Sequence, residues 1–209
     1  MASTIHFVYP ILVVLGCTLL YRERLTGKKA LCCGLCFGGI LCFYRPEAGG
    51  NLTGVVLAFC SGATYAAYVI YYAKSGLSAL NPFKVNFYLS LLSALMLAVL
   101  GIASGQLTAY HAPAGWAVAI LFSFLIAVLA TVLFQKGTKR IGAENAALLS
   151  TFEPVTGVVI GITVFSEPLT LRTMAGVVLI LSAVLLLTAG EKKQREEDSL
   201  RFGKTRKRW

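Results

Sequence analysis

The chain has 209 residues, of which 57% are hydrophobic and 13% charged, and its mean hydropathy is +0.75. A soluble domain of this size cannot bury so much apolar surface, so we expect lipid to surround most of the chain. The net charge of +10 would suggest nucleic acid as a partner of a soluble protein. Here the basic residues gather in short polar breaks and in the C-terminal tail, a pattern that indicates membrane topology and argues against nucleic acid.

Seven apolar runs approach the roughly 20 residues that a helix needs to cross a bilayer. They cover residues 5–21, 30–44, 52–73, 83–104, 115–135, 146–165 and 171–189. The second run is short and needs little tilt or a thin stretch of membrane. The predicted fold is therefore an all-α, polytopic transmembrane bundle of about seven helices.

The basic residues predict an orientation. If the seven helices alternate in direction, all of the 19 Lys and Arg residues except Arg45 and Arg172 fall on the side of the C-terminus. Positively charged loops stay in the cytoplasm. We therefore expect residues 191–209 to form a basic cytoplasmic tail, the N-terminus to lie outside, and the chain to sit in the plasma membrane.

A short motif occurs twice, 144 positions apart. Tyr-Arg-Glu-Arg-Leu-Thr at residues 21–26 returns as Phe-Ser-Glu-Pro-Leu-Thr at residues 165–170, and each copy follows a proline, Pro10 or Pro154, at the same distance. The predicted topology places the two copies on opposite sides of the membrane, so the repeat is inverted. Inverted repeats around a site near the bilayer midplane are typical of secondary transporters.

Each of these prolines predicts a helix break. Proline has no backbone N–H to donate, so Pro154 leaves the Ser150 carbonyl without its helical partner, and Pro10 does the same to the His6 carbonyl. Interrupted helices in corresponding segments of two repeats point to a binding site.

Glu153 is the candidate with the strongest physical argument. It is an acidic residue deep inside an apolar run, where an ionisable group is costly and is a functional candidate by default. It could take and release a proton during a transport cycle, or it could be a structural carboxylate that braces the bend beside it. In the first copy Tyr9 occupies the corresponding place and His6 that of Ser150; we expect His6 to be solvated near the membrane surface rather than to titrate in a cavity.

Polar and aromatic side chains recur at helical spacing in the run 52–73 and could line a cavity for a small amphipathic substrate. The candidates are Ser61, Thr64, Tyr65 and Tyr68, and Asn86 is a further polar candidate inside the next run. Tyr71 and Tyr72 are also in this run, but they could belong to an aromatic belt at the membrane surface beside Lys74 instead of lining a cavity.

Glu23 and Glu167, the acidic residues of the repeated motif, lie at helix ends just before a new run. We interpret them as parts of a helix connector, in which Thr170 caps the following helix, with direct substrate contact as the alternative. The six cysteines lie within apolar runs and are expected to pack as small hydrophobes, so no metal site is predicted.

The segments Phe152-Glu-Pro-Val-Thr-Gly, Val164-Phe-Ser-Glu-Pro-Leu-Thr and Ala175-Gly-Val-Val-Leu-Ile-Leu resemble the EamA family of the drug/metabolite transporter superfamily. The resemblance implies a bacterial inner-membrane permease of ten helices in two five-helix units, mostly exporting amino acids or other small metabolites. Residues 1–46 then correspond to the last two helices of the first unit and residues 50–190 to a complete second unit, so about three N-terminal helices are lacking.

Two functions follow. The first is a secondary transporter that exports small metabolites such as amino acids by alternating access. The second is a truncated, non-transporting fragment or helper subunit that pairs with another chain, a second copy of itself or the missing helices. The sequence has no glycine-rich phosphate-binding loop and no span that combines Ser with His or clusters metal ligands, so we expect neither a cofactor nor an enzyme.

Overall fold

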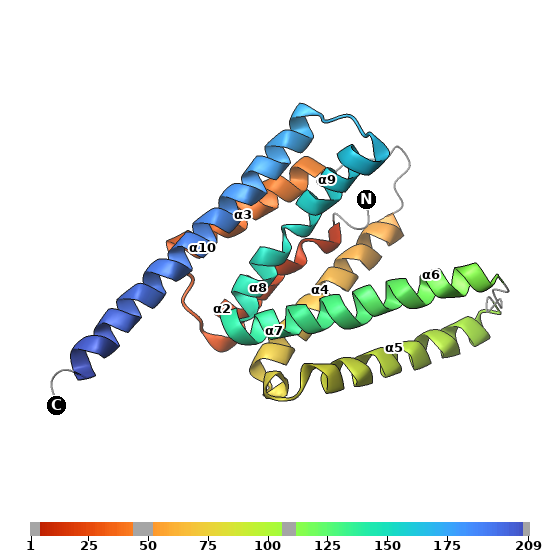
Figure 1. Cartoon of the computed structure of the whole chain (residues 1–209), viewed down its shortest axis with the longest axis horizontal. Coiled ribbons are helices and arrows are strands. Elements are labelled where there is room, and N and C mark those ends of the chain that lie inside the picture. The colour runs from red at the N-terminus through yellow and green to blue at the C-terminus, as the bar shows by residue number, and fades with distance from the viewer. Residues whose placement is uncertain (1–4, 44–51, 106–111, 207–209) are drawn as a thin grey trace. The chain divides into compact units, whose positions relative to one another are not determined.

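The computed structural model describes residues 5–43, 52–105 and 112–206, with side chains up to Ala189. The described residues are helical and contain no strand (Figure 1). They divide into two units, one formed by Met1–Ile70 with Ala143–Trp209 and the other by Tyr71–Gly142, and each unit is described by itself. Arg45 and the side chains of the basic tail lie outside the described residues.

The first unit contains both copies of the repeat. Its helices are α2 (Tyr9–Tyr21), α3 (Gly27–Phe43), most of α4 (Leu52–Lys74), α8 (Ala143–Ser150), α9 (Glu153–Phe165) and α10 (Leu171–Arg206). Helix α10 continues well past the end of the predicted span at residue 189.

The second unit is a helical hairpin. It contains the 3₁₀ turn η1 (Leu77–Ala79), α5 (Pro82–Ala103), α6 (Pro113–Ser123), the π-helix η2 (Phe124–Ala130) and α7 (Thr131–Ile141). Helices α6, η2 and α7 follow one another without interruption and form one rod that lies beside α5 (Figure 1). Between α5 and this rod, the buried Asn86 of α5 donates a hydrogen bond from its side-chain amide to the Ala127 carbonyl of the π-helix, at 2.7 Å.

The prediction of a multi-pass membrane protein is confirmed by the length and composition of the helices. In the part of the chain that the structure describes, five helical runs are long and apolar enough to cross a bilayer: Leu52–Lys74, Pro82–Ala103, Pro113–Ile141, Ala143–Phe165 and Leu171–Ala189. The two N-terminal runs are shorter, because α2 has 13 residues after a turn and α3 has 17. The predicted run 115–135 was too short at both ends, since its helix continues to Ile141.

The two copies of the repeat begin with the same backbone geometry. Val8 has φ −69° and ψ −18° immediately before α2, and Phe152 has φ −68° and ψ −18° before α9. In each copy this residue's carbonyl accepts from the amide three positions later, at 3.1 Å from Ile11 and 3.0 Å from Val155. A proline at the start of each helix imposes this entry, because its fixed φ suits the first helical turn.

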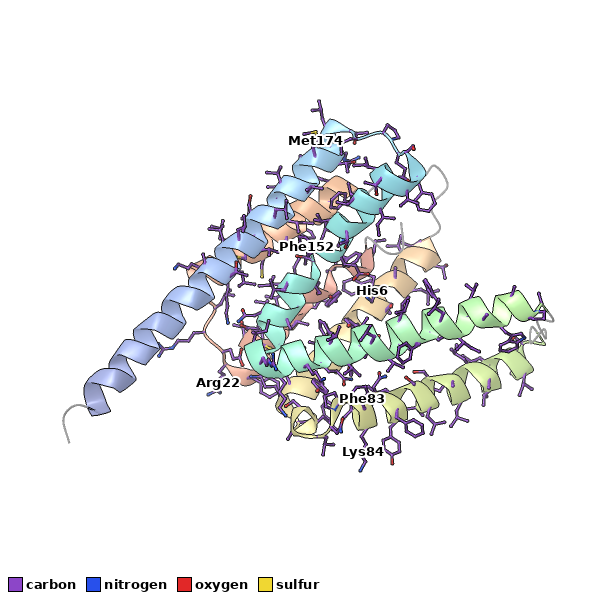
Figure 2. The ribbon with its side chains drawn as sticks, viewed as in Figure 1. His6, Arg22, Phe83, Lys84, Phe152 and Met174 are labelled. Atoms are coloured by element: carbon purple, nitrogen blue, oxygen red, sulfur yellow. The ribbon has the colours of Figure 1, made fainter. Side chains whose placement is uncertain are left out.

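The two copies also end alike. Arg22 and Ser166 both have φ 53°, a left-handed conformation that closes the helix. Figure 2 labels Arg22 at the end of α2. The next amide, that of Glu23 or Glu167, donates back to the carbonyl of Cys17 or Gly161, at 3.3 and 3.0 Å. The sequence repeat is thus a repeat of backbone structure.

The repeated helices run in opposite directions. Helix α3 lies along α10 with Cys32 near Ala183 and Gly39 near Gly176, so residue numbers rise along one helix as they fall along the other (Figure 1). A shift of 144 positions carries Cys32 to Gly176 and Gly39 to Ala183. One contact therefore becomes the other when the copies are exchanged, as a half-turn axis between the two helices requires.

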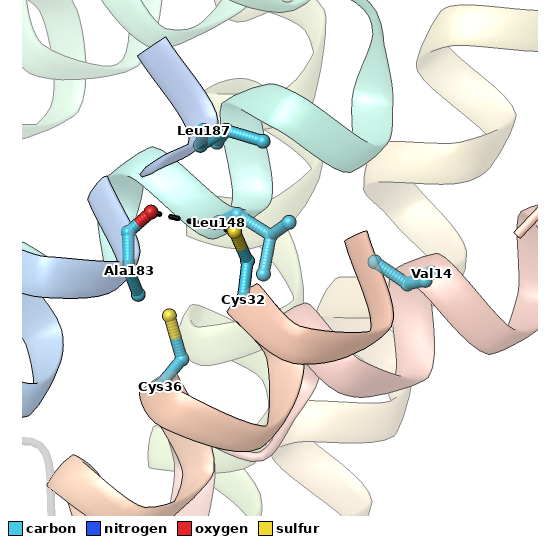
Figure 3. Packing of buried hydrophobic residues seen from close by; sticks show 6 residues of the cluster. All are labelled: Val14, Cys32, Cys36, Leu148, Ala183 and Leu187. Atoms are coloured by element: carbon cyan, nitrogen blue, oxygen red, sulfur yellow. Dashed lines mark hydrogen bonds between the residues drawn. The ribbon is translucent and has the colours of Figure 1, made fainter. Parts of the chain in front are cut away.

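The core of this unit lies where α2, α3, α8 and α10 meet. It contains Val14, Cys32, Cys36, Leu148, Ala183 and Leu187 (Figure 3). The Cys32 thiol donates to the Ala183 carbonyl at 3.4 Å, and the Cys36 thiol contacts the Thr151 hydroxyl at 3.3 Å. All six thiols are free, and these two cysteines pack as the small, weakly polar side chains that close helix contacts need.

Close approach of α3 and α10 depends on glycine. A Cβ at Gly39 would lie 2.6 Å from Ile180 Cγ1 and 3.0 Å from the Gly176 carbonyl oxygen, whereas a Cβ at Gly34 of the same helix would meet nothing within 4 Å. Small residues at such positions let backbones pack tightly in membranes.

We predict that Gly39→Ala lowers the midpoint of thermal unfolding in detergent, because the added methyl forces the two helices apart at a cost of about 1–3 kcal/mol. Gly34→Ala is the matched control and should unfold at or above the wild-type temperature, since alanine favours the helix. Equal midpoints for the two variants would show that the contact between α3 and α10 is looser than described.

Candidate functional site

The site begins at the interruption between α8 and α9. Thr151 and Phe152 form a turn there, with amides that donate to Leu148 and Leu149 carbonyls at 3.3 and 3.1 Å, and α9 restarts at Glu153. The first copy has the matching turn at Phe7 and Val8 before α2. Figure 2 labels Phe152 inside the second break and His6 just before the first.

The two breaks contact each other. The Ser150 hydroxyl donates its proton to the Ala147 carbonyl at 2.7 Å, so the Tyr9 hydroxyl is the donor in its hydrogen bond to Ser150 Oγ. Tyr9 is only 3% exposed. Side chains therefore join the two interrupted helices where their backbone hydrogen bonding is weakest.

A cavity of about 340 Å³ opens beside this contact. It is lined by His6, Phe7, Tyr9, Tyr65 and Glu153. These residues come from both copies of the repeat and from α4, and all belong to the first unit. The volume lies at the lower end of the range for small-molecule sites, about 300–1,000 Å³.

Aromatic rings form most of the cavity wall. The Tyr9 and Tyr65 rings meet edge to face, with centroids 4.8 Å apart and planes at 88°. The His6 ring lies 5.5 Å from Tyr9 and 5.6 Å from Tyr65, and Tyr68 extends the series with its ring 5.8 Å from Tyr65. Such a wall offers apolar area together with the electron-rich faces of the rings.

The cavity lies close to the axis that relates the two copies of the repeat. The shift of 144 positions carries Tyr9 to Glu153 and His6 to Ser150, so the pair Tyr9–Ser150 corresponds to the pair Glu153–His6. The first pair is hydrogen-bonded and the residues of the second face the same cavity. The four positions therefore surround the axis that relates the copies.

Glu153 brings the charge to this cavity. It is near the middle of the 23-residue apolar run Ala143–Phe165. Among the described residues its carboxylate has neither an ion pair nor a hydrogen bond, and it is the charged member of the cavity lining. A carboxylate held in an apolar span without a protein partner is arranged to meet a cation or a proton from outside the protein.

The other candidates from the sequence divide into two groups. Ser61 lies beside the cavity, where its hydroxyl and His6 Nδ1 are 3.1 Å apart. Thr64 points its hydroxyl back to the Cys60 carbonyl of its own helix, and Asn86 belongs to the second unit and donates to Ala127. Thus Tyr9, Tyr65 and Glu153 share one cavity, Tyr68 and Ser61 adjoin it, and Thr64 and Asn86 satisfy backbone carbonyls.

Glu23 and Glu167 lie in the connectors between repeated helices. In both copies the threonine three residues later caps the next helix, since Lys29 N donates to Thr26 Oγ1 at 3.4 Å and Thr173 N to Thr170 Oγ1 at 3.2 Å. The Glu167 carboxylate packs over Gly161, where an added Cβ would lie 2.9 Å from Oε2. This geometry is that of a helix connector.

A buried ion pair was not foreseen from the sequence. The Lys29 ammonium, on the first turn of α3, binds Glu144 Oε2 at the start of α8, and the Glu144 side chain is only 4% exposed. Ligand atoms of Cys17, Glu23 and Glu144 lie within 4.8 Å of one another, which makes them the candidate metal ligands of the described residues. The ammonium of Lys29 already compensates this charge. A clue in the sequence was Glu144, an acidic residue two positions after Gly142, close to a span and on the same predicted side of the membrane as the basic loop that contains Lys29.

We predict that Lys29→Met destabilises the chain by about 3 kcal/mol, because it leaves the buried Glu144 carboxylate without its counter-charge. The exposed neighbour Lys28 provides the control, and Lys28→Met should leave the midpoint of thermal unfolding in detergent near the wild-type value. If the two variants unfold together, the ion pair does not hold α3 against α8.

Comparisons with known proteins agree on a family. The model of the EamA-like transporter family matches residues 52–189. An uncharacterized transporter of Archaeoglobus fulgidus is 28% identical over 191 residues, which cover 89% of this chain and 66% of that protein. The uncharacterized transporters YvbV of Bacillus subtilis and sll1319 of Synechocystis are 26% and 28% identical, over 92% and 89% of this chain and 64% and 57% of their own lengths.

The chain therefore spans between about half and two thirds of the length of the curated relatives that it matches. The family model covers well over half of the chain itself. With its all-helical fold, its apolar spans and its repeated, oppositely directed helices, this chain belongs to the EamA-like transporter family.

Proposed function

We propose that the chain acts as a secondary transporter that exports small metabolites such as amino acids by alternating access, with the cavity beside Glu153 as the substrate site. The observation that carries this proposal is the position of the cavity. It lies where two interrupted helices, one from each copy of an inverted repeat, contact each other. Substrate sites of repeat-built transporters lie between such helices.

The asymmetry of the four central residues supports alternating access. In the described state Tyr9 is bonded to Ser150, while Glu153 and His6 are not bonded to each other. In an inverted-repeat transporter the opposite state arises when the two copies exchange conformations. That exchange would open the Tyr9–Ser150 contact and bring the Glu153 carboxylate to His6.

We place residues 1–46 as the last two helices of a first repeat and residues 50–190 as the second repeat. In this proposal the C-terminus is cytoplasmic and the N-terminus external, because basic side chains concentrate on one side. The membrane that we propose is a bacterial inner membrane. Coupling comes from an ion gradient, and a proton is the simplest coupling ion for a site that contains Glu153 and His6.

A second candidate function is favoured by the length comparison. This chain covers 66%, 64% and 57% of three of its relatives, so it could act as a non-transporting fragment or as a helper. A second copy, or a subunit that carries the helices matched to the remainder of the relatives, would then complete the transport path.

Reconstitution separates these functions. The purified chain in proteoliposomes should release preloaded radiolabelled small metabolites, amino acids and organic amines among them, faster than empty liposomes when a pH gradient is imposed. No flux from the chain alone, with flux restored by co-reconstitution with a subunit that carries the additional helices, would favour the helper.

We predict that Glu153→Gln and His6→Asn each flatten the pH dependence of this flux, because each removes one partner of the exchange described above. Glutamine keeps the size of glutamate, and asparagine keeps a polar group at the position of His6 Nδ1 on a smaller side chain, so expression and monodispersity in detergent should be retained. Thr163→Val, on an exposed part of α9 away from the cavity, should keep the wild-type pH profile. An unchanged profile for Glu153→Gln would remove this carboxylate from coupling.

A further inference from the structure

We propose that the cavity selects organic amines, held by their ammonium group, over zwitterionic amino acids and over carboxylic acids. This inference rests on the proposed function, since it names the substrate class of the same site. It follows from three properties of the described residues: the charge of the lining, the arrangement of the rings, and the hydrogen bonds that the polar groups already make.

The charge of the lining favours a cation. Glu153 carries the charge of the cavity, and none of the described lining residues is Lys or Arg. The Lys and Arg residues of the described part lie near helix ends and in connectors, such as Arg22, Lys29 and Arg172. A ligand carboxylate would thus enter an apolar site without a permanent counter-charge, which is costly, whereas an ammonium meets one directly.

The rings favour the same ligand. His6, Tyr9 and Tyr65 lie within 5.6 Å of one another, centroid to centroid, around one side of the cavity, and Phe7 adds a fourth aromatic side chain to its lining. Cations are attracted to the faces of Tyr and Phe rings within about 6 Å of the centroid. The organic part of the ligand packs against the same rings, so an aromatic or aliphatic amine uses both features.

The hydrogen bonds among the lining residues leave the Glu153 carboxylate as the group that binds the ligand ammonium. The Tyr9 hydroxyl is committed to Ser150, and His6 Nδ1 lies at 3.1 Å from the Ser61 hydroxyl. Glu153 has no such partner among the described residues. A ligand ammonium, with its several N–H donors, can donate to the Glu153 carboxylate without breaking an existing hydrogen bond.

The volume sets the size of the ligand. A volume of about 340 Å³ has room for a single-ring amine. Phenethylamine, phenylalanine and 3-phenylpropionate then form a matched series, because they share a phenylethyl body and differ in whether they carry an ammonium, both charged groups or a carboxylate.

Equilibrium binding to the whole chain in detergent, measured by isothermal titration calorimetry with these three compounds, tests the proposal. Phenethylamine should bind roughly tenfold or more tightly than phenylalanine, since one charge-assisted hydrogen bond is made and no carboxylate is desolvated. Binding of 3-phenylpropionate should be weaker still. Equal affinities, the reverse order, or no binding of phenethylamine would overturn the proposal.

Variants test the contributions of the Glu153 carboxylate and of the Tyr65 ring separately. Glu153→Gln should weaken phenethylamine binding by roughly tenfold or more and should strengthen binding of 3-phenylpropionate, because it removes a like charge from the site. Tyr65→Leu should weaken phenethylamine several-fold, and Tyr65→Phe, which keeps the ring, should restore it. Thr163→Val should bind as wild type. Unchanged phenethylamine affinity in Glu153→Gln would refute the role of the carboxylate.

The binding experiment is independent of transport. If the chain binds phenethylamine in the expected order but moves no substrate in proteoliposomes, the ligand assignment stands and the transport function of the isolated chain falls. If it transports but prefers phenylalanine or 3-phenylpropionate in the binding series, the transporter stands and the amine assignment falls.

Discussion

The structure depends on the two helical hydrogen bonds that Pro10 and Pro154 cannot make, because proline has no backbone N–H. Inside a bilayer a backbone carbonyl without its helical partner has no water to turn to, so an interrupted span is tolerated where protein covers it or where it lines a polar cavity. Pro10 and Pro154 create two such interruptions, and the fold brings them together, with the Tyr9 hydroxyl bonded to Ser150. The cavity, its polar lining and its place between the two copies all follow from that meeting.

Much of the fold could be predicted from the sequence, because the hydrophobic runs and the repeat extend over many residues and can be recognised in a single sequence. The repeated motif predicted two related halves, and the structure shows matching hydrogen bonds at the ends of α2 and α9. The π-helix η2 could not be anticipated in this way, since nothing in the apolar run Phe124–Ala130 marks a change of helical register. Its stabilisation by Asn86 depends on a neighbouring helix.

The site was predictable only in part, because contacts between residues far apart in the sequence leave no pattern along the chain. Glu153 is conspicuous because a carboxylate in an apolar run is rare, and the repeat pairs it with Tyr9. His6 was expected at the membrane surface, yet it lines the cavity, since the turn before α2 and the close approach to Gly62 of α4 bring it inward. Lys29 and Glu144 pair across 115 residues, a separation that spacing along the chain does not reveal.

Divergence between the repeats has an electrostatic consequence at the axis. Two identical halves related by a half-turn would place the same side chain twice at the centre, either two facing carboxylates or two facing phenols. Two carboxylates at such close quarters would repel, and one would be forced to hold a proton permanently. With a phenol on one half and a carboxylate on the other, the fused chain has one carboxylate at its centre and needs no bound proton to offset a second one.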